Sequence, residues 1–255
     1  MASWALVTGA TAGIGESFTR LLAENNYNLV LVARDVSRLQ ERASQLQSQF
    51  NVQTHIIQAD LSTEAGCSAV EQYIANNQID VLINNAGFGI NKAFTLSELK
   101  VEQEMFDVLV RTPMRLMHIV LPGMKQRNKG VLINVSSVAG YIAGGSYSAA
   151  KSYLTVISES LHTELAGTNV KISALCPGFT RTEFHQRGRM SMKGLPSFMW
   201  LNSDKLVAKA WSDAMKGKAV SIPGWQYQLL IFVIQSLPRS IIRKVGMNLR
   251  AKQRK

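Results

Sequence analysis

Residues 4–15 have the sequence WALVTGATAGIG, which predicts a short strand, a tight turn and the start of a helix. Three glycines follow the apolar run 4–8 within residues 9–15. Glycines here let the backbone turn sharply and approach a pyrophosphate, whose charge is met by free N–H groups and the helix dipole. We interpret the loop as a dinucleotide site, with a glycine-rich turn that binds no ligand as the alternative. The residues expected to contact the dinucleotide are Gly9, Thr11, Gly13, Ile14 and Gly15.

Strands and helices are predicted to alternate along the chain beyond this turn. Further strands are expected at 28–33, 54–58, 79–83, 131–135, 170–175 and 219–222, and helices at 36–49, 63–76, 100–126, 147–166 and 204–215. Pro113 falls inside the third of these helices, where it is either tolerated or kinks the helix. The alternation predicts an α/β fold, a doubly wound parallel sheet with right-handed crossovers in one domain.

Composition places the chain among globular proteins and argues against a nucleic-acid partner. Hydrophobic residues make up 46% of the 255 residues and charged residues 18%. The net charge is +11, but seven basic and no acidic residues lie between 239 and 255, so without them it would be an ordinary +4. Cys67 and Cys176 have no metal-ligand spacing, so we expect no metal site and a reducing compartment. No secretory signal is recognised before the first strand, and a cytoplasmic protein is expected.

A second stretch, SSVAGYIAGGSYSAAK at 136–151, carries the chemistry. On a helix, Tyr147 and Lys151 would lie one turn apart on one face. A nearby ammonium favours phenolate over phenol, so it lowers the tyrosine pKa from about 10 and makes the phenol a better proton donor near neutrality. Because such pairs also arise by chance, a solvated helix face is the alternative.

Together with NNAG at 84–87 and Pro177-Gly178, these motifs occur in the order found in the short-chain dehydrogenase/reductase family. The chain resembles that family over about residues 3–222. The resemblance implies a Rossmann-type sheet and a nicotinamide cofactor. It also implies hydride transfer between that cofactor and a ketone, aldehyde or secondary alcohol.

The resemblance assigns roles to individual residues. Ser137 would hydrogen-bond the substrate carbonyl, Tyr147 would donate the proton, and Lys151 would bind the nicotinamide ribose and lower the tyrosine pKa. The other cofactor contacts that it implies are Asp60 at the adenine, Thr182 at the carboxamide, and Asn84, Ala86, Gly87, Pro177 and Gly178 around the centre of the cofactor.

Arg34 indicates which nicotinamide cofactor is bound. Enzymes specific for NAD usually place a carboxylate at the end of the second strand for the ribose 2′-OH, whereas a 2′-phosphate needs a cation there. This chain has Arg34 at that position, and Arg38 follows one turn later. NADP(H) is therefore preferred over NAD(H), although Ala12 replaces the basic residue often found in the glycine loop and Asp35 adjoins Arg34. A surface salt bridge is the alternative role for Arg34.

The chain departs from the family pattern in two places. Leu109 occupies the position of the asparagine that usually holds a water for the proton relay, and leucine cannot bind that water. Either another group relays the proton or turnover is slower. The bend between Ser137 and Tyr147 is also shorter than in most members. Ser136 or Ser146 could then supply the carbonyl hydrogen bond instead of Ser137.

Two segments point to the partners. Residues 179–203, where the family keeps its substrate lid, contain Met190 and Met192 among other apolar side chains, so we expect a hydrophobic substrate. Residues 223–255 form a tail with an apolar run followed by a basic amphipathic pattern on which Val245 and Leu249 fall. The tail suits a subunit interface, its own domain or an anionic membrane surface. By resemblance, a homodimer or homotetramer would form through helices 100–126 and 147–166.

Overall fold

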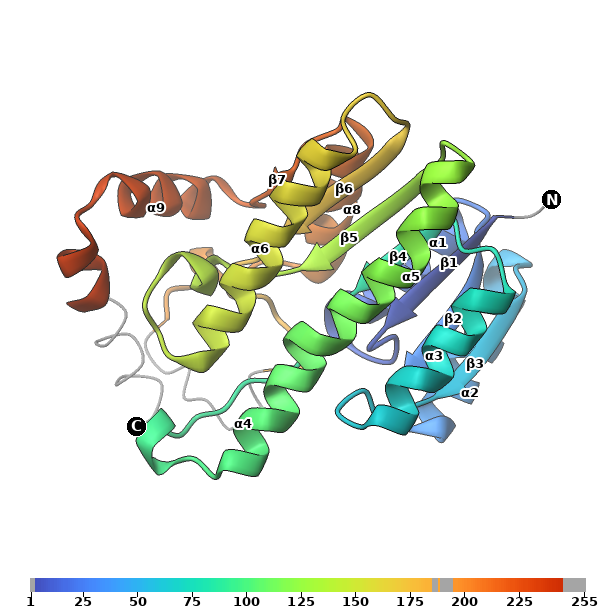
Figure 1. Cartoon of the computed structure of the whole chain (residues 1–255), viewed down its shortest axis with the longest axis horizontal. Helices are drawn as coiled ribbons and strands as arrows, with labels where there is room; N and C mark the ends of the chain where they lie inside the picture. Colours follow the sequence, from blue (N-terminus) through green and yellow to red (C-terminus); the bar gives the residue numbers. More distant parts are fainter. Residues whose placement is uncertain (1–2, 185–187, 189–194, 245–255) are drawn as a thin grey trace.

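The computed structural model describes residues 3–184, 188 and 195–244. Within them, a single sheet of parallel strands has the order β3-β2-β1-β4-β5-β6-β7 (Figure 1). The strands are β1 (Trp4–Thr8), β2 (Asn28–Ala33), β3 (Thr54–Gln58), β4 (Val81–Asn84), β5 (Gly130–Val135), β6 (Val170–Leu175) and β7 (Val220–Ser221). The prediction of an α/β fold with a doubly wound parallel sheet in one domain is confirmed.

Helices cover both faces of the sheet. One face carries α1 (Gly13–Glu24), α2 (Val36–Phe50) and α8 (Ser203–Met215), and the face toward the viewer in Figure 1 carries α3 (Glu64–Asn76), α5 (Thr112–Gln126) and α6 (Ser146–Glu164). Phe18, Leu39 and Val207 fill the first core layer. Val70, Leu116 and other apolar side chains fill the second. The central strands are apolar on both sides because both faces are buried.

The strand order reverses between β1 and β4, which pair in parallel with Ala5 opposite Val81. The chain leaves β1 toward one face and β4 toward the other, so their carboxyl ends open a crevice. In doubly wound sheets ligands bind at this switch point. Both the glycine loop after β1 and the residues 84–87 after β4 lie there.

The predicted helix 100–126 is continuous but contains one wide turn. It consists of α4 (Leu99–Phe106), a π-helical turn η2 (Asp107–Arg111) and α5. Pro113 has no N–H to donate to the carbonyl of Leu109, and its ring would crowd that carbonyl in a regular α-helix. The wide turn therefore accommodates Pro113, and it is centred on Leu109.

The segment predicted as a lid is described at its two ends. Thr180 and Leu201 form a parallel bridge, and the Leu201 N–H donates to the Phe179 carbonyl at 2.8 Å. The two ends of the segment therefore lie side by side next to β6. Met190 and Met192 lie outside the described residues.

The apolar part of the tail forms helix α9 (Trp225–Ser236), at the left of Figure 1. Tyr227 is fully buried, and its hydroxyl donates to the Met199 carbonyl at 2.5 Å and accepts from the Phe179 N–H at 2.9 Å. Helix α9 thus packs on the domain. Val245 and Leu249 lie outside the described residues. Of the helices in the described ranges, none combines the length and the hydrophobicity needed to cross a bilayer.

Candidate active site

The glycine loop forms a backbone cradle at the carboxyl end of β1. Gly9 and Gly13 have φ angles of +67° and +56°, which side chains rarely tolerate. A Cβ on Gly15 would lie 2.1 Å from the Gly9 carbonyl oxygen, so the loop closes only with glycine there. Helix α1 begins after Ala12 without a side-chain cap. This uncapped helix start fits a pyrophosphate, which would accept from its N–H groups.

Hydrogen bonds between the carboxyl ends of β1 and β4 hold the glycine loop in place. The backbone N–H groups of Asn85 and Ala86 donate to the Thr8 hydroxyl at 2.9 and 3.0 Å. The Asn85 side-chain amide donates back to the carbonyls of Thr8 and Gly9 at 2.9 and 3.2 Å. Sequence reasoning assigned no role to Thr8 or Asn85. The signal was available, since Thr8 ends the first strand directly before Gly9 and Asn85 lies within the motif 84–87 after the neighbouring strand.

The other residues predicted at the cofactor are distributed around this crevice. Asn84 is buried, and its side-chain N–H donates to Asn134 at 2.9 Å, while its side-chain oxygen has no partner among the described residues; its contact with the cofactor stays a prediction. Thr182 lies against the loop, because a Cβ on Gly13 would be 2.9 Å from the threonine side chain. Gly178 faces Tyr227, and Pro177 precedes it; their roles at the cofactor stay predictions.

The two arginines near the end of β2 differ in their partners. Arg38 forms two hydrogen bonds to Glu183, at 3.2 and 3.0 Å, and this pairing raises its pKa. Arg34 is exposed, and among the described residues no carboxylate lies within ion-pair distance of it. Partial burial opposes ionisation of Asp60, but hydrogen bonds from Ser62 and the charge of Arg34 lower its pKa overall. Arg34 is therefore the guanidinium with room for a 2′-phosphate.

Tyr147 and Lys151 lie in the first turns of α6, as predicted from their spacing. Lys151 is 4% exposed, and its ammonium donates to the Val135 carbonyl at 2.6 Å and lies 5.8 Å from the centre of the Tyr147 ring. Burial lowers the pKa of Lys151 to about 8. The Phe184 ring packs beside Tyr147 with centroids 6.0 Å apart. A phenol and a buried cation are thus held together at the carboxyl end of β5.

The three serines considered for the substrate carbonyl have different surroundings. The Ser136 hydroxyl is buried and donates to the Lys151 carbonyl at 2.6 Å. The Ser146 hydroxyl donates to Glu102 at 2.5 Å. Ser137 is partly exposed and accepts from the Ala139 N–H at 3.1 Å, so its own proton is available to a substrate. The geometry leaves Ser137 as the best placed of the three, and its role stays a prediction.

A buried carboxylate that sequence reasoning missed stands at the start of α6. Glu102, 8% exposed on α4, accepts from the hydroxyls of Ser146 and Ser97, each at 2.5 Å. Gly145 provides no side-chain cap for α6. A negative charge is stabilising at a helix N-terminus. Glu102 therefore fixes the helix start that carries Tyr147, although it lies 44 residues before Ser146.

Leu109 lies next to Lys151. Its side chain is fully buried, among Ile90, Met105 and Val110. A Cβ on Gly87 would lie 2.7 Å from the Leu109 side chain and 3.8 Å from the Lys151 nitrogen. Leu109 therefore presents an apolar group beside Lys151, where the family pattern expects an amide.

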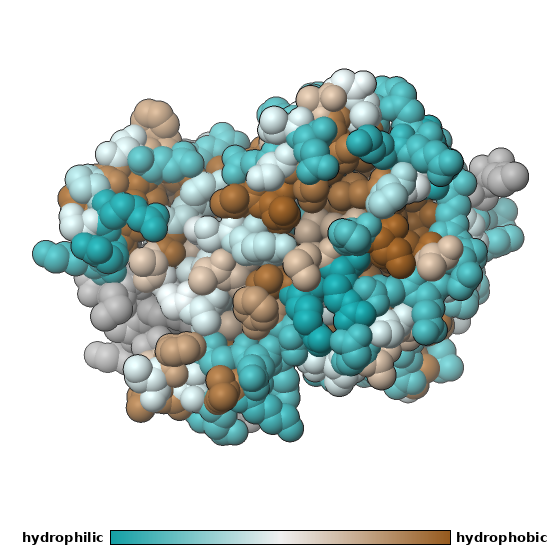
Figure 2. Space-filling view, in the orientation of Figure 1, coloured by the Kyte–Doolittle hydropathy of each residue, from teal (hydrophilic) through white to brown (hydrophobic). Residues whose placement is uncertain are grey.

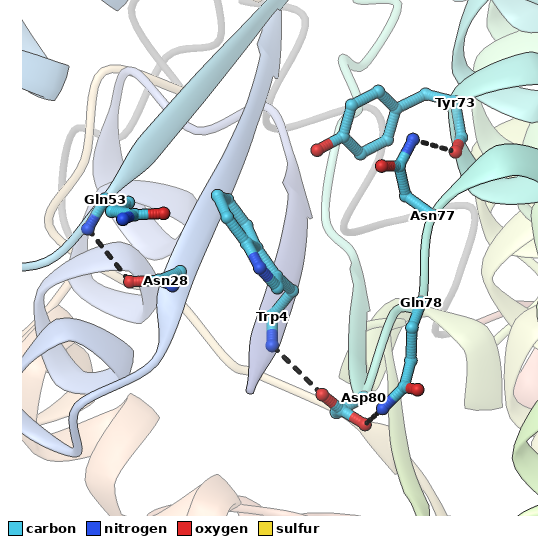
Figure 3. Close-up of a pocket in the computed structure, with 7 residues that line it drawn as sticks. All are labelled: Trp4, Asn28, Gln53, Tyr73, Asn77, Gln78 and Asp80. Atoms are coloured by element: carbon cyan, nitrogen blue, oxygen red, sulfur yellow. Dashed lines mark hydrogen bonds between the residues drawn. The ribbon is translucent and has the colours of Figure 1, made fainter. Parts of the chain in front are cut away.

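A hollow at the amino ends of the strands, opposite the candidate active site, is not part of that site. Figure 3 shows the residues that line this hollow, among them Trp4 and Asn28 at the amino ends of β1 and β2 and Asp80 just before β4. The Trp4 N–H and the Gln78 amide both donate to Asp80, at 3.0 and 2.9 Å. Because these groups satisfy one another and ligands of parallel sheets bind at the carboxyl ends, we interpret the hollow as structural.

Comparison with known proteins agrees with this geometry. Residues 3–192 match the family model described as short chain dehydrogenase. The chain belongs to the short-chain dehydrogenase/reductase family. It is therefore an oxidoreductase with a nicotinamide cofactor, and the residues of the glycine cradle fit that group.

Individual relatives place the chain within the family. It is 29% identical to a very-long-chain 3-oxoacyl-CoA reductase-like protein of Arabidopsis thaliana, over 94% of this chain and 78% of the relative. It is 33% identical to the ketoacyl reductase HetN of a Nostoc species, over 85% of this chain and 76% of the relative. A short-chain dehydrogenase from Sphingobium yanoikuyae in complex with NADPH superimposes with a TM-score of 0.84 at 29% identity, covering 91% of this chain and 93% of that one.

Proposed function

We propose that the protein reduces a hydrophobic ketone or aldehyde with NADPH, or oxidises the matching secondary alcohol with NADP⁺. The observation that carries the proposal is the Tyr147–Lys151 pair, one helical turn apart at the carboxyl end of β5, with Lys151 buried and Tyr147 partly buried. The bound nicotinamide supplies the hydride in reduction and accepts it in oxidation. Tyr147 gives its phenolic proton to the carbonyl oxygen in reduction and takes it back in oxidation. Ser137 donates a hydrogen bond to the same oxygen.

Lys151 keeps a positive charge next to the phenol. With a pKa of about 8, its ammonium is mostly protonated at pH 7, so it favours the phenolate that remains after proton transfer. The hydrogen bond to the Val135 carbonyl fixes the position of this charge. Lys151 would also bind the nicotinamide ribose.

NADP(H) is favoured over NAD(H) because of Arg34. Its guanidinium is exposed at the end of β2, the strand end that meets the adenosine ribose in this fold. The NADPH named with the Sphingobium yanoikuyae structure supports the same choice.

The substrate is proposed to be an apolar carbonyl compound. At the two described ends of the segment, Phe184 packs beside Tyr147, and Phe179 packs beside Trp200. The names of two relatives, a 3-oxoacyl-CoA reductase-like protein and a ketoacyl reductase, favour a carbonyl on an acyl chain as one form of it. A lipid reductase that meets its substrate at a membrane is a variant of the same proposal.

A second candidate is an NADP(H)-binding sensor or scaffold with little turnover. Leu109 favours it, because an apolar side chain beside Lys151 provides no path for replacing the proton that Tyr147 gives away. The intact Tyr147 and Lys151 favour the enzyme.

One experiment separates the two candidates. NADPH oxidation is followed with a panel of aliphatic, aromatic and acyl-chain carbonyls, using wild type, Tyr147→Phe and Tyr153→Phe. Loss of a general acid lowers turnover by about 10²- to 10⁴-fold, so Tyr147→Phe should lose activity while still binding NADPH. Tyr153→Phe, a change on the same helix, should keep it. NADPH binding without any Tyr147-dependent turnover would favour the sensor.

We further propose a homodimer or homotetramer in the cytoplasm, paired through α5 and α6. Met114 and Val156 are 47% and 57% exposed on these helices. Figure 2 shows hydrophobic side chains gathered on this face, where α5 and α6 lie in Figure 1. Sedimentation of wild type and Val156→Glu would test the pairing, since a charge in that interface should produce monomers.

A further inference from the structure

Helix α9 is apolar on two opposite sides. At 100° per residue, Tyr227, Ile231 and Ile234 share one side, and all three are buried. Trp225, Leu229, Phe232 and Val233 share the other, and they are 72%, 56%, 70% and 46% exposed. A helix that is hydrophobic all round is ordinarily enclosed. Here only one side is covered by the described part of the chain.

The buried side joins α9 to the substrate end of the site. Ile231 and Ile234 pack with Ile242 against Val138, Tyr141 and Ile142, which form the bend that follows Ser137. Tyr227 fixes the start of the helix through its bonds to the segment 179–199. Whatever covers the outer side of α9 is therefore held close to the entrance for substrate.

The charge around α9 is of one sign. The last acidic residue of the chain is Asp213, and every charged residue after it is basic. Arg239, Arg243 and Lys244 follow the helix directly and are exposed, and four more basic residues complete the sequence. Figure 2 shows hydrophobic and hydrophilic side chains next to each other over this part of the molecule, at the upper left.

From these observations we propose that the outer side of α9, with Arg239, Arg243 and Lys244, docks on an anionic lipid surface. Exposed aromatic and aliphatic side chains next to basic ones match the acyl boundary and the headgroups of such a surface. A second copy of the chain fits less well. A two-fold interface brings the same patch of both subunits together, so the cationic residues of both copies would enter one interface to which the patch contributes no carboxylate. Docking would present the bend after Ser137 to the lipid that delivers an apolar substrate.

Flotation of the full chain with vesicles tests the proposal. Vesicles of phosphatidylcholine with phosphatidylserine should carry the protein, and binding should weaken in high salt or with phosphatidylcholine alone. Leu229→Ser/Phe232→Ser should weaken binding at least about tenfold, because two exposed apolar side chains that docking would bury in the lipid are lost. Arg239→Gln/Arg243→Gln/Lys244→Gln should weaken it about fivefold for each charge removed.

The controls separate docking from other causes. Leu96→Ser removes an even more exposed leucine, 75% exposed on η1 (Phe94–Leu96), and should leave binding unchanged. Thermal unfolding and NADPH binding should be the same in all variants. The proposal is overturned if no vesicle binds, if Leu96→Ser weakens binding as much as Leu229→Ser/Phe232→Ser, or if the α9 variants change only the oligomeric state.

Discussion

Helices α1 and α6 both begin at the active site without a capping side chain of their own, yet the two starts are used in opposite ways. The start of α1 is lined by glycines and left open. The start of α6 receives the buried carboxylate of Glu102 through Ser146. Both ends carry the same partial positive charge. An open end can therefore hold a ligand, whereas an end neutralised by the protein positions the side chains that follow it.

One added methyl group should disrupt the open start of α1. In Gly15→Ala the new Cβ would meet the Gly9 carbonyl at 2.1 Å, so the loop must shift away from the pyrophosphate position. We expect NADPH affinity to fall about a hundredfold or more, as the close backbone approach is lost. Fluorescence titration measures this. Gly123→Ala, which meets only a flexible arginine, should bind as wild type. Undiminished binding by Gly15→Ala would contradict the cradle.

Removal of the Glu102 carboxylate should destabilise the start of α6. Glu102→Ala leaves the Ser146 hydroxyl without its acceptor and removes the charge from the helix start, whereas the Ser97 hydroxyl can still donate to the Phe94 carbonyl. The free energy of unfolding should fall by about 2 to 4 kcal/mol. Chemical denaturation measures the loss, and Glu102→Gln should lose less because its carbonyl still accepts. Glu104→Ala, on the same helix, is the control. If Glu104→Ala lowers the free energy of unfolding as much as Glu102→Ala does, the proposed role of Glu102 at the start of α6 is contradicted.

The pH dependence of stability tests whether Lys151 is buried. Its pKa is about 8 in the folded protein and 10.5 when unfolded, so between these values the unfolded chain binds more protons. Stability contributed by this group therefore rises with pH across that window, by up to about 1.4 kcal/mol per pH unit. The measurement is the difference in unfolding free energy between cofactor-free wild type and Lys151→Met. A difference that is flat from pH 8 to 10 would show that the lysine is solvated.

The smallest expected effect concerns the choice between NADPH and NADH. Arg34→Ala should weaken NADPH binding about tenfold, because the 2′-phosphate loses one charged hydrogen-bonding partner. NADH binding should change little. Arg38→Ala should do less, because that guanidinium already pairs with Glu183. Binding titrations with both nucleotides decide it. Equal losses for NADPH and NADH would remove the argument for NADP(H).

Local patterns predicted most of the fold and part of the site. The strands 4–8, 28–33, 54–58 and 170–175 were predicted with the observed bounds. Three of them are apolar runs that end at turn residues, and the half-exposed strand 54–58 followed from its place in the alternation of strands and helices. The one-turn spacing of Tyr147 and Lys151 followed from helix geometry alone.

What could not be predicted depends on contacts between distant residues. Glu102 meets Ser146 only because α4 packs beside α6, and Tyr227 meets Gly178 only in the folded chain. The wide turn at Leu109 was missed for a different reason. Pro113 marks a disturbance of the helix, but the sequence alone does not distinguish a kink from a π turn.

The contact between Gly178 and Tyr227 limits how the two positions can change during evolution. A Cβ on residue 178 would lie 2.0 Å from the tyrosine ring, so no larger residue fits while the ring remains. A smaller residue at 227 would leave a cavity at the base of α9. Among descendants of this chain, the two positions should therefore covary, with an aromatic residue at 227 only where 178 is glycine.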